Sequence, residues 1–144
     1  MPYDPAIVTI YFDFYGESFD PQEITERLKM KPTTQFKKGE PMPSSLTRSR
    51  RRDGWVLTAA SAETFHIDDL LDELKAAVTA TPEAIRMVAS DFEVEAVVTC
   101  EIVAQSEVMP SVVFPPDFAE WVSARGATIC VDISAYVLDD EETS

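Results

Sequence analysis

Three segments of the sequence alternate apolar and polar residues, a pattern typical of a β-strand that buries one face. They span residues 6–15, 92–103 and 128–138, and in the first segment every second residue from Val8 to Phe14 is apolar. Residues two apart on a strand point to the same face. We therefore expect a sheet that packs one face against helices and leaves the other partly exposed to solvent.

Helical patterns lie between these strands. The longest is predicted over residues 65–80, where apolar residues recur at i, i+3, i+4, i+7 and i+11. Its apolar stripe consists of Ile67, Leu70, Leu71, Leu74 and Val78. Shorter elements complete the pattern. One helix begins after Asp20 and is stopped by Pro32, a second begins after Thr81, and a third follows Pro116 and ends at about Arg125, before Gly126. Short strands are predicted at 54–60 and 111–114.

The resulting order, β-α-(loop)-β-α-β-β-α-β, predicts an α+β fold with a mostly antiparallel sheet and helices on one face. From the second strand onward this is the order of the ferredoxin-like split βαβ arrangement. The same periodicity predicts one shared core that contains Ile10, Phe12, Leu71, Leu74, Val98, Trp121 and Ile133.

The length of 144 residues predicts a single domain over residues 1–144. Residues 33–53 are rich in proline, serine and arginine and are predicted to form a basic loop insert, and residues 139–144 a frayed acidic tail. No apolar run approaches the roughly 20 residues of a membrane span. The first residues lack the basic start of a secretory signal, so we expect a cytoplasmic protein.

The charge of the chain is unevenly distributed. Between Arg27 and Arg52 there are nine basic residues and one acid, a net +8, which leaves −22 for the rest of a chain whose net charge is −14. The overall acidity argues against binding to nucleic acid or membranes. The basic segment is either a loop balanced by acids of this chain or of a second copy, or an anion or partner site. The candidate residues are Lys37, Lys38, Arg48, Arg50, Arg51 and Arg52.

Carboxylates also project from the predicted strands. If their polar faces coincide, they form a site for a hard cation or an acid–base pair. The alternative is a solvated sheet face that discourages pairing with another chain. The residues of this acidic face are Asp13, Glu93, Glu95, Glu101 and Asp132.

Other chemistry-bearing residues are few. His66 is the sole histidine, so no histidine pair can bind a metal. Cys100 and Cys130 lie in predicted strands, where we expect free thiols, although a bridge across the sheet stays open. No Gly-rich phosphate loop or nucleophile motif is found in the sequence. We expect no metal, no cofactor and no catalytic residue.

The order of short motifs resembles a known family. They are Asp20-Pro21 with Glu23-Ile24-Thr25 and Leu28, Lys31-Pro32-Thr33-Thr34, Lys37-Lys38-Gly39-Glu40, Gly54-Trp55, the helix from Ile67, Arg125-Gly126-Ala127, Ile129, Val131-Asp132-Ile133 and Ala135-Tyr136. Together they resemble the bacterial domain-of-unknown-function family 4279 over nearly the whole chain. The resemblance implies a bacterial origin and an α+β fold. That family has no established activity, so the resemblance assigns no catalytic residue.

These features predict a small, non-enzymatic module that binds a macromolecule, either another protein or a second copy of itself. A specific version is an acidic immunity- or antitoxin-like inhibitor, because dense negative charge speeds capture of a basic partner and mimics nucleic-acid phosphate. The alternative is an enzyme or small-ligand binder that uses the strand carboxylates or the basic loop as an anion site. A broad negative surface favours the first hypothesis, and a pocket with converging polar groups favours the second.

Overall fold

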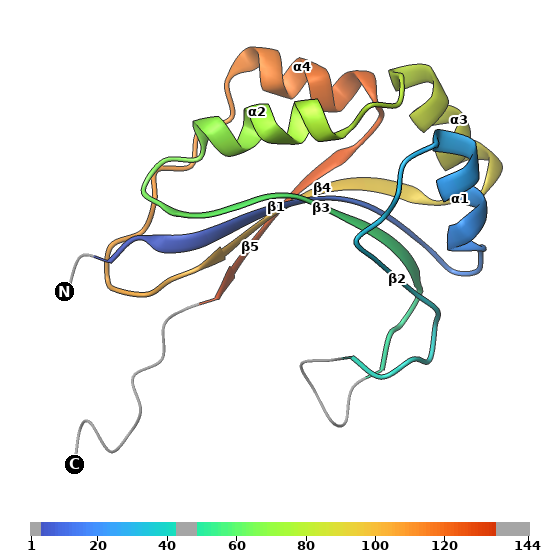
Figure 1. Cartoon of the computed structure of the whole chain (residues 1–144), viewed down its shortest axis with the longest axis horizontal. Helices are drawn as coiled ribbons and strands as arrows, with labels where there is room; N and C mark the ends of the chain where they lie inside the picture. Colours follow the sequence, from blue (N-terminus) through green and yellow to red (C-terminus); the bar gives the residue numbers. More distant parts are fainter. Residues whose placement is uncertain (1–3, 43–48, 135–144) are drawn as a thin grey trace.

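A computed structural model describes residues 4–42 and 49–134, and in them four helices cover one face of a curved, five-stranded sheet (Figure 1). The strands are β1 (Ala6–Gly16), β2 (Thr34–Phe36), β3 (Asp53–Thr64), β4 (Glu95–Val103) and β5 (Thr128–Ser134). The helices are α1 (Pro21–Leu28), α2 (Asp68–Ala77), α3 (Pro82–Asp91) and α4 (Pro116–Ala124). No described helix is long and apolar enough to cross a bilayer.

The strands lie side by side in the order β2-β3-β1-β4-β5. The central strand β1 is antiparallel to both β3 and β4, whereas β5 is parallel to β4. The α+β class and the mostly antiparallel sheet are therefore confirmed. The ferredoxin-like order is not confirmed, because it required a strand over residues 111–114 that would pair with the preceding strand.

Two short segments differ from the prediction. Ser111 forms only an isolated bridge with His66, because Pro110 and the two prolines after Phe114 remove the backbone donors that a ladder needs. Conversely, β2 lies inside the predicted loop of residues 33–53 and pairs with β3. Three residues are too few to show a period of two, so the pattern of the sequence alone does not reveal this edge strand.

Two of the helices, α1 and α3, begin where their capping residues predict, whereas α2 begins at Asp68 without a side-chain cap, three residues after the predicted start. The side chain of Asp20 accepts a hydrogen bond from the amide of Gln22, and the Thr81 hydroxyl accepts one from Ala84, at 3.0 and 3.1 Å. A proline follows each of these caps, where its missing amide hydrogen costs nothing. An ion pair of 3.0 Å between Lys75 and Asp117 joins α2 to α4 on the helical side.

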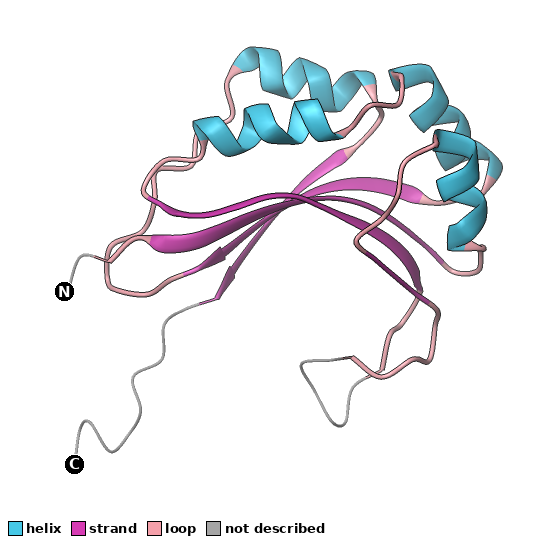
Figure 2. Ribbon diagram, in the orientation of Figure 1, coloured by secondary structure: helices cyan, strands magenta, loops and turns pink. Residues whose placement is uncertain are grey.

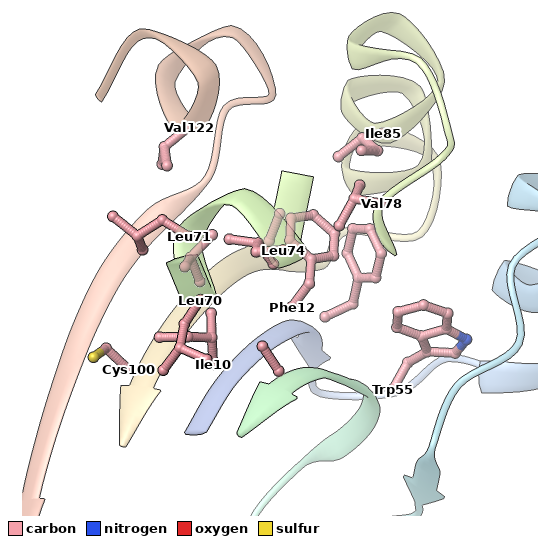
Figure 3. Close-up of a cluster of buried hydrophobic side chains, with 14 of the residues drawn as sticks. Ile10, Phe12, Trp55, Leu70, Leu71, Leu74, Val78, Ile85, Cys100 and Val122 are labelled. Carbon is pink, nitrogen blue, oxygen red and sulfur yellow. The ribbon is translucent and has the colours of Figure 1, made fainter. Parts of the chain in front are cut away.

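The core lies between the helices and the sheet (Figure 3). Leu74 of α2 is fully buried there, and Phe12, Phe14 and Trp55 form a chain of edge-to-face ring contacts with centroids 5.4 and 5.5 Å apart. Five of the seven predicted core residues are buried: Ile10, Phe12, Leu71, Leu74 and Val98.

Two predicted core residues differ from the other five. Trp121 is only partly buried and packs against the edge of the core. Ile133 is 58% exposed, so its assignment to the core is wrong. Ile129, at the beginning of β5, packs against the core, but among the described residues nothing covers the end of this edge strand.

The two cysteines are free. Cys100 pairs with Val131 in the parallel register, and Cys130 pairs with Thr99. Since neighbouring residues of a strand point to opposite faces, the two thiols lie on opposite sides of the sheet and cannot form a bridge within the chain. Burial raises the pKa of Cys100 to about 11, which leaves an unreactive thiol.

Candidate functional site

The candidate site is a concave cavity of about 530 Å³ on the open face of the sheet, opposite the helices. Figure 2 shows all four helices on the other side. Because Phe12 and Phe14 point into the core, the alternate residues of β1, namely Tyr11, Asp13 and Tyr15, point to the open face. Polar side chains of β4 and β5 continue this surface on one side, and β2, β3 and the basic segment bound it on the other.

Asp13 lies in the floor of the cavity and is only 1% exposed. Its Oδ2 accepts hydrogen bonds from the hydroxyls of Tyr15 and Thr99, both at 2.9 Å. Its Oδ1 is buried and has no hydrogen-bond partner among the described residues. In register, Asp13 lies between Val56 of β3 and Val97 of β4, two apolar neighbours that replace water around the carboxyl.

Burial raises the pKa of Asp13 to about 6, and the two hydroxyl hydrogen bonds only partly oppose this effect. Burial also raises the pKa of Tyr15, and the nearby Asp13 carboxylate raises it further. The Tyr15 hydroxyl therefore stays protonated and donates to Asp13. The cavity floor thus holds a carboxyl group that changes its charge close to neutral pH.

Two further carboxylates line the same cavity farther along the strands, since Glu101 pairs with Thr9 of β1 whereas Asp13 pairs with Val97. Glu101 of β4 accepts a hydrogen bond of 3.2 Å from the hydroxyl of Tyr11, and Asp132 is its register partner on β5. Burial and the charge of Glu101 raise the pKa of Tyr11, so its hydroxyl is a stable donor. The described residues contain no group of three or more histidines, cysteines or carboxylates arranged to hold a metal ion. The alternative of a hard-cation site on the acidic face therefore gains no support from the described residues.

Arginines form the opposite side of the site. The guanidinium of Arg50 lies 3.9 Å from the centroid of the Phe36 ring, and that of Arg52 lies 4.6 Å from the centroid of the Tyr15 ring. They line a second hollow of about 470 Å³ together with Arg51. None of these arginines forms an ion pair with a carboxylate of the described residues.

Gly54 makes room for the ring of Phe36. A Cβ atom on Gly54 would lie 2.1 Å from Cζ of Phe36, far closer than two carbon atoms can approach. The absence of a side chain lets the Phe36 ring lie over β3 at the entrance of the cavity, where it carries Arg50. The Gly-Trp motif of the sequence thus has two roles, since Trp55 points the other way into the core.

The basic segment is attached to the sheet by a buried carboxylate. Asp53, at the start of β3 and 2% exposed, accepts hydrogen bonds from the Lys37 ammonium and from the amides of Lys38 and Phe19, at 2.8, 2.6 and 2.8 Å. Burial alone raises the pKa of Asp53, but these hydrogen bonds outweigh it and hold the pKa below its usual range. Lys37 is therefore an anchor of the segment.

Replacing Asp53 with asparagine is expected to lower the free energy of unfolding by about 1–3 kcal/mol near neutral pH, because the Lys37 ammonium and the two backbone amides lose a charged acceptor. A depressed pKa stabilises the fold above the unfolded value of about 4, and this contribution is lost as the pH falls through the folded value. Urea unfolding of the wild type and of Asp53→Asn at several pH values measures this contribution. The two free energies of unfolding should converge as the solution becomes acidic. Glu17→Gln, which removes the exposed partner of Lys38, is the matched control and should change little. Equal losses in both variants would contradict the anchoring role.

The sequence matches the model of one protein family, described as "Domain of unknown function (DUF4279)", over residues 6–136. The match covers most of the chain. The chain belongs to the DUF4279 family. This confirms the resemblance found in the sequence motifs. Neither a curated protein nor a solved structure matches the chain.

The DUF4279 domain brings part of the predicted acidic face together. Asp13, Glu101 and Asp132 line one cavity. Glu95 pairs with Tyr15 and is exposed at the start of β4. Glu93 lies before β4 with a positive φ of 53°, so it is a turn residue and not part of the strand as predicted.

The predicted basic residues of the DUF4279 domain separate into two groups. Arg50, Arg51 and Arg52 line the second hollow, whereas the lysines serve other contacts: Lys37 with Asp53, and Lys38 with Glu17 at 3.3 Å. Arg48 lies outside the described residues. His66 is exposed beside α2 and away from the cavity lining.

Sequence reasoning did not identify the aromatic and hydroxyl residues of the site, namely Tyr11, Tyr15, Phe36 and Thr99. The signal for the two tyrosines was present, because they occupy the polar face of a strand beside Asp13. Phe36 gave no signal, since its place at the cavity depends on pairing between β2 and β3.

Proposed function

We propose that the DUF4279 domain binds a small organic ligand in the cavity on the open face of its sheet. Polar groups from β1, β4 and β5 converge there on a hollow of a size suited to a small molecule. A pocket with converging polar groups favours the ligand-binding alternative over the acidic inhibitor, for which a broad negative surface is expected. Binding to another protein, to a second copy or as an acidic inhibitor stays a prediction.

The single observation that carries this proposal is the unpartnered oxygen of Asp13. A buried acceptor without a partner costs about 1–3 kcal/mol, and native proteins seldom keep one unless it serves another purpose. A hydrogen-bond donor on a ligand would satisfy Oδ1. The aromatic ring of Phe36 and the adjoining Arg50 provide further contact area at the entrance.

A screen by thermal unfolding tests this proposal. Small amines, amides and guanidines are added to the wild type, to Asp13→Asn, and to Asp117→Asn as the control, since Asp117 lies on the helical side. A ligand at tenfold its Kd should raise the Tm of the wild type and the control by roughly 3–5 °C, with little effect on Asp13→Asn.

The comparison is made against each variant's own Tm without ligand, because Asp13→Asn is itself expected to change stability. Compounds that raise the Tm of all three proteins equally bind elsewhere on the molecule. If every stabilising compound behaves in this way, the cavity is not the binding site and the proposal is wrong.

A further inference from the structure

The cavity on the open face and the second hollow adjoin each other. Both are lined by Tyr15, Phe36, Met42 and Arg50. The carboxylates Asp13, Glu101 and Asp132 lie in the first part, and Arg51 and Arg52 lie in the second. Two adjoining hollows therefore carry opposite charges, with Arg50 in the lining of both.

Tyr15 connects the carboxylate end of the site with the arginine end. Its hydroxyl donates to Asp13 at 2.9 Å, and its ring lies beneath the guanidinium of Arg52. Its ring centroid is 6.2 Å from that of Phe36, which carries Arg50. The distance from the Asp13 carboxyl to the Arg52 guanidinium is thus about the length of one tyrosine side chain. A small molecule can span the same distance.

The arginines are arranged to receive an anion. A guanidinium that lies over an aromatic ring uses its flat face for that contact, and its N–H groups point outward from the edge. Those edges match the oxygens of a carboxylate or a phosphate. Within the described part of the chain, no carboxylate occupies them.

The other end is arranged to receive a cation that donates hydrogen bonds. Asp13 offers its buried Oδ1, and Glu101 and Asp132 add negative charge farther along the same cavity. An ammonium group has three donors and no acceptor, so it suits a site built from acceptors. A neutral hydrogen-bond donor would leave the charges of this end unbalanced.

We propose that the ligand of this site is zwitterionic, with an ammonium group at Asp13 and a carboxylate or phosphate at Arg50 and Arg52. This inference rests on the proposed function and specifies the class of ligand. A ligand with one charge gains at one end and is repelled or left unpaired at the other. A molecule with both charges is attracted at both ends.

Titrations followed by NMR on the full chain test the inference with matched probes. The first set is 4-aminobutyrate, butyrate and butylamine, and the second is O-phosphoethanolamine, ethyl phosphate and ethanolamine. In at least one set the zwitterion should bind about tenfold more tightly than either singly charged partner, since it adds a second charge-assisted contact. The set with the larger difference distinguishes carboxylate from phosphate.

Two variants assign the ends. Asp13→Asn should reduce the affinity of the preferred zwitterion to that of the matched anion and leave the anion unaffected. Arg50→Gln should reduce it to the affinity of the matched amine. Lys75→Gln, on the helical side, is the control and should change neither. Far-ultraviolet circular dichroism of each variant confirms that it is folded.

The outcomes separate the two proposals. If a singly charged probe shifts the signals of the open face and binds as tightly as the zwitterion, the inference on ligand class is overturned while the binding site stands. If no probe of either set shifts those signals, the zwitterion inference is wrong, and the thermal screen alone then decides the proposed function.

Discussion

At about pH 8, replacing Asp13 with asparagine is expected to raise the free energy of unfolding by about 1–3 kcal/mol. The folded protein holds an ionised carboxyl between Val56 and Val97 with one oxygen unpartnered, and the neutral amide avoids this desolvation. Tyr15 and Thr99 can still donate to the amide oxygen. The upper limit follows from the rise of the pKa to about 6 from the ordinary aspartate value of 3.8.

The pH dependence gives the sign of this effect. Because folding raises the pKa of Asp13, the stability linked to its proton is fully present below the unfolded value of about 4 and is lost as the pH rises through about 6. The gain from Asp13→Asn should therefore be large at about pH 8 and small at about pH 4. Urea unfolding at both pH values measures it.

Asp117→Asn provides the control of opposite sign, because Lys75 holds the pKa of the exposed Asp117 below its usual range. It should lose a little stability at high pH, where Asp13→Asn gains. A variant Asp13→Asn that is less stable than the wild type at about pH 8 would show that the carboxylate is needed for folding, contrary to this account.

Replacing Leu74 with alanine is expected to lower the free energy of unfolding by about 2–5 kcal/mol. Leu74 is fully buried between α2 and the sheet, beside Phe12 (Figure 3), and the truncated side chain leaves a cavity in this closely packed region. Chemical denaturation measures the loss, and the open face should keep its ligand affinity because Leu74 lies on the other side of the sheet.

Met87→Ala is the matched control for the effect of truncation. Met87 lies on α3 and is 58% exposed, so its truncation should change the free energy of unfolding by less than about 0.5 kcal/mol. If Leu74→Ala and Met87→Ala have the same denaturation midpoint, our assignment of the face of α2 that packs against the sheet is wrong.

The prediction for Asp13 connects stability with function. A residue that destabilises the fold when ionised, and whose conservative replacement stabilises it, is typical of a site kept for binding at a cost in stability. Asp53 gives the contrast within the same sheet. Its carboxylate is fully hydrogen-bonded and anchors the basic segment, so its replacement is expected to destabilise the fold.

The sequence by itself determined the local features of the protein. The period of two in β1 assigned Phe12 and Phe14 to one face and Asp13 to the other, and the stripe of α2 identified Leu74 as a core residue. Caps and prolines predicted where helices begin. These features depend on residues a few positions apart, and their geometry is fixed by the repeat of the strand or helix alone.

Only the tertiary structure decided which elements are neighbours. Periodicity assigns each residue a side of its own strand, but the sheet order β2-β3-β1-β4-β5 places Asp13, Glu101 and Asp132 in one cavity with the arginines beyond Tyr15. It also leaves Ile133 exposed on an edge strand despite its alternating pattern. Contacts between residues far apart in the chain depend on how helices and strands pack as whole elements, and no short window of sequence contains that information.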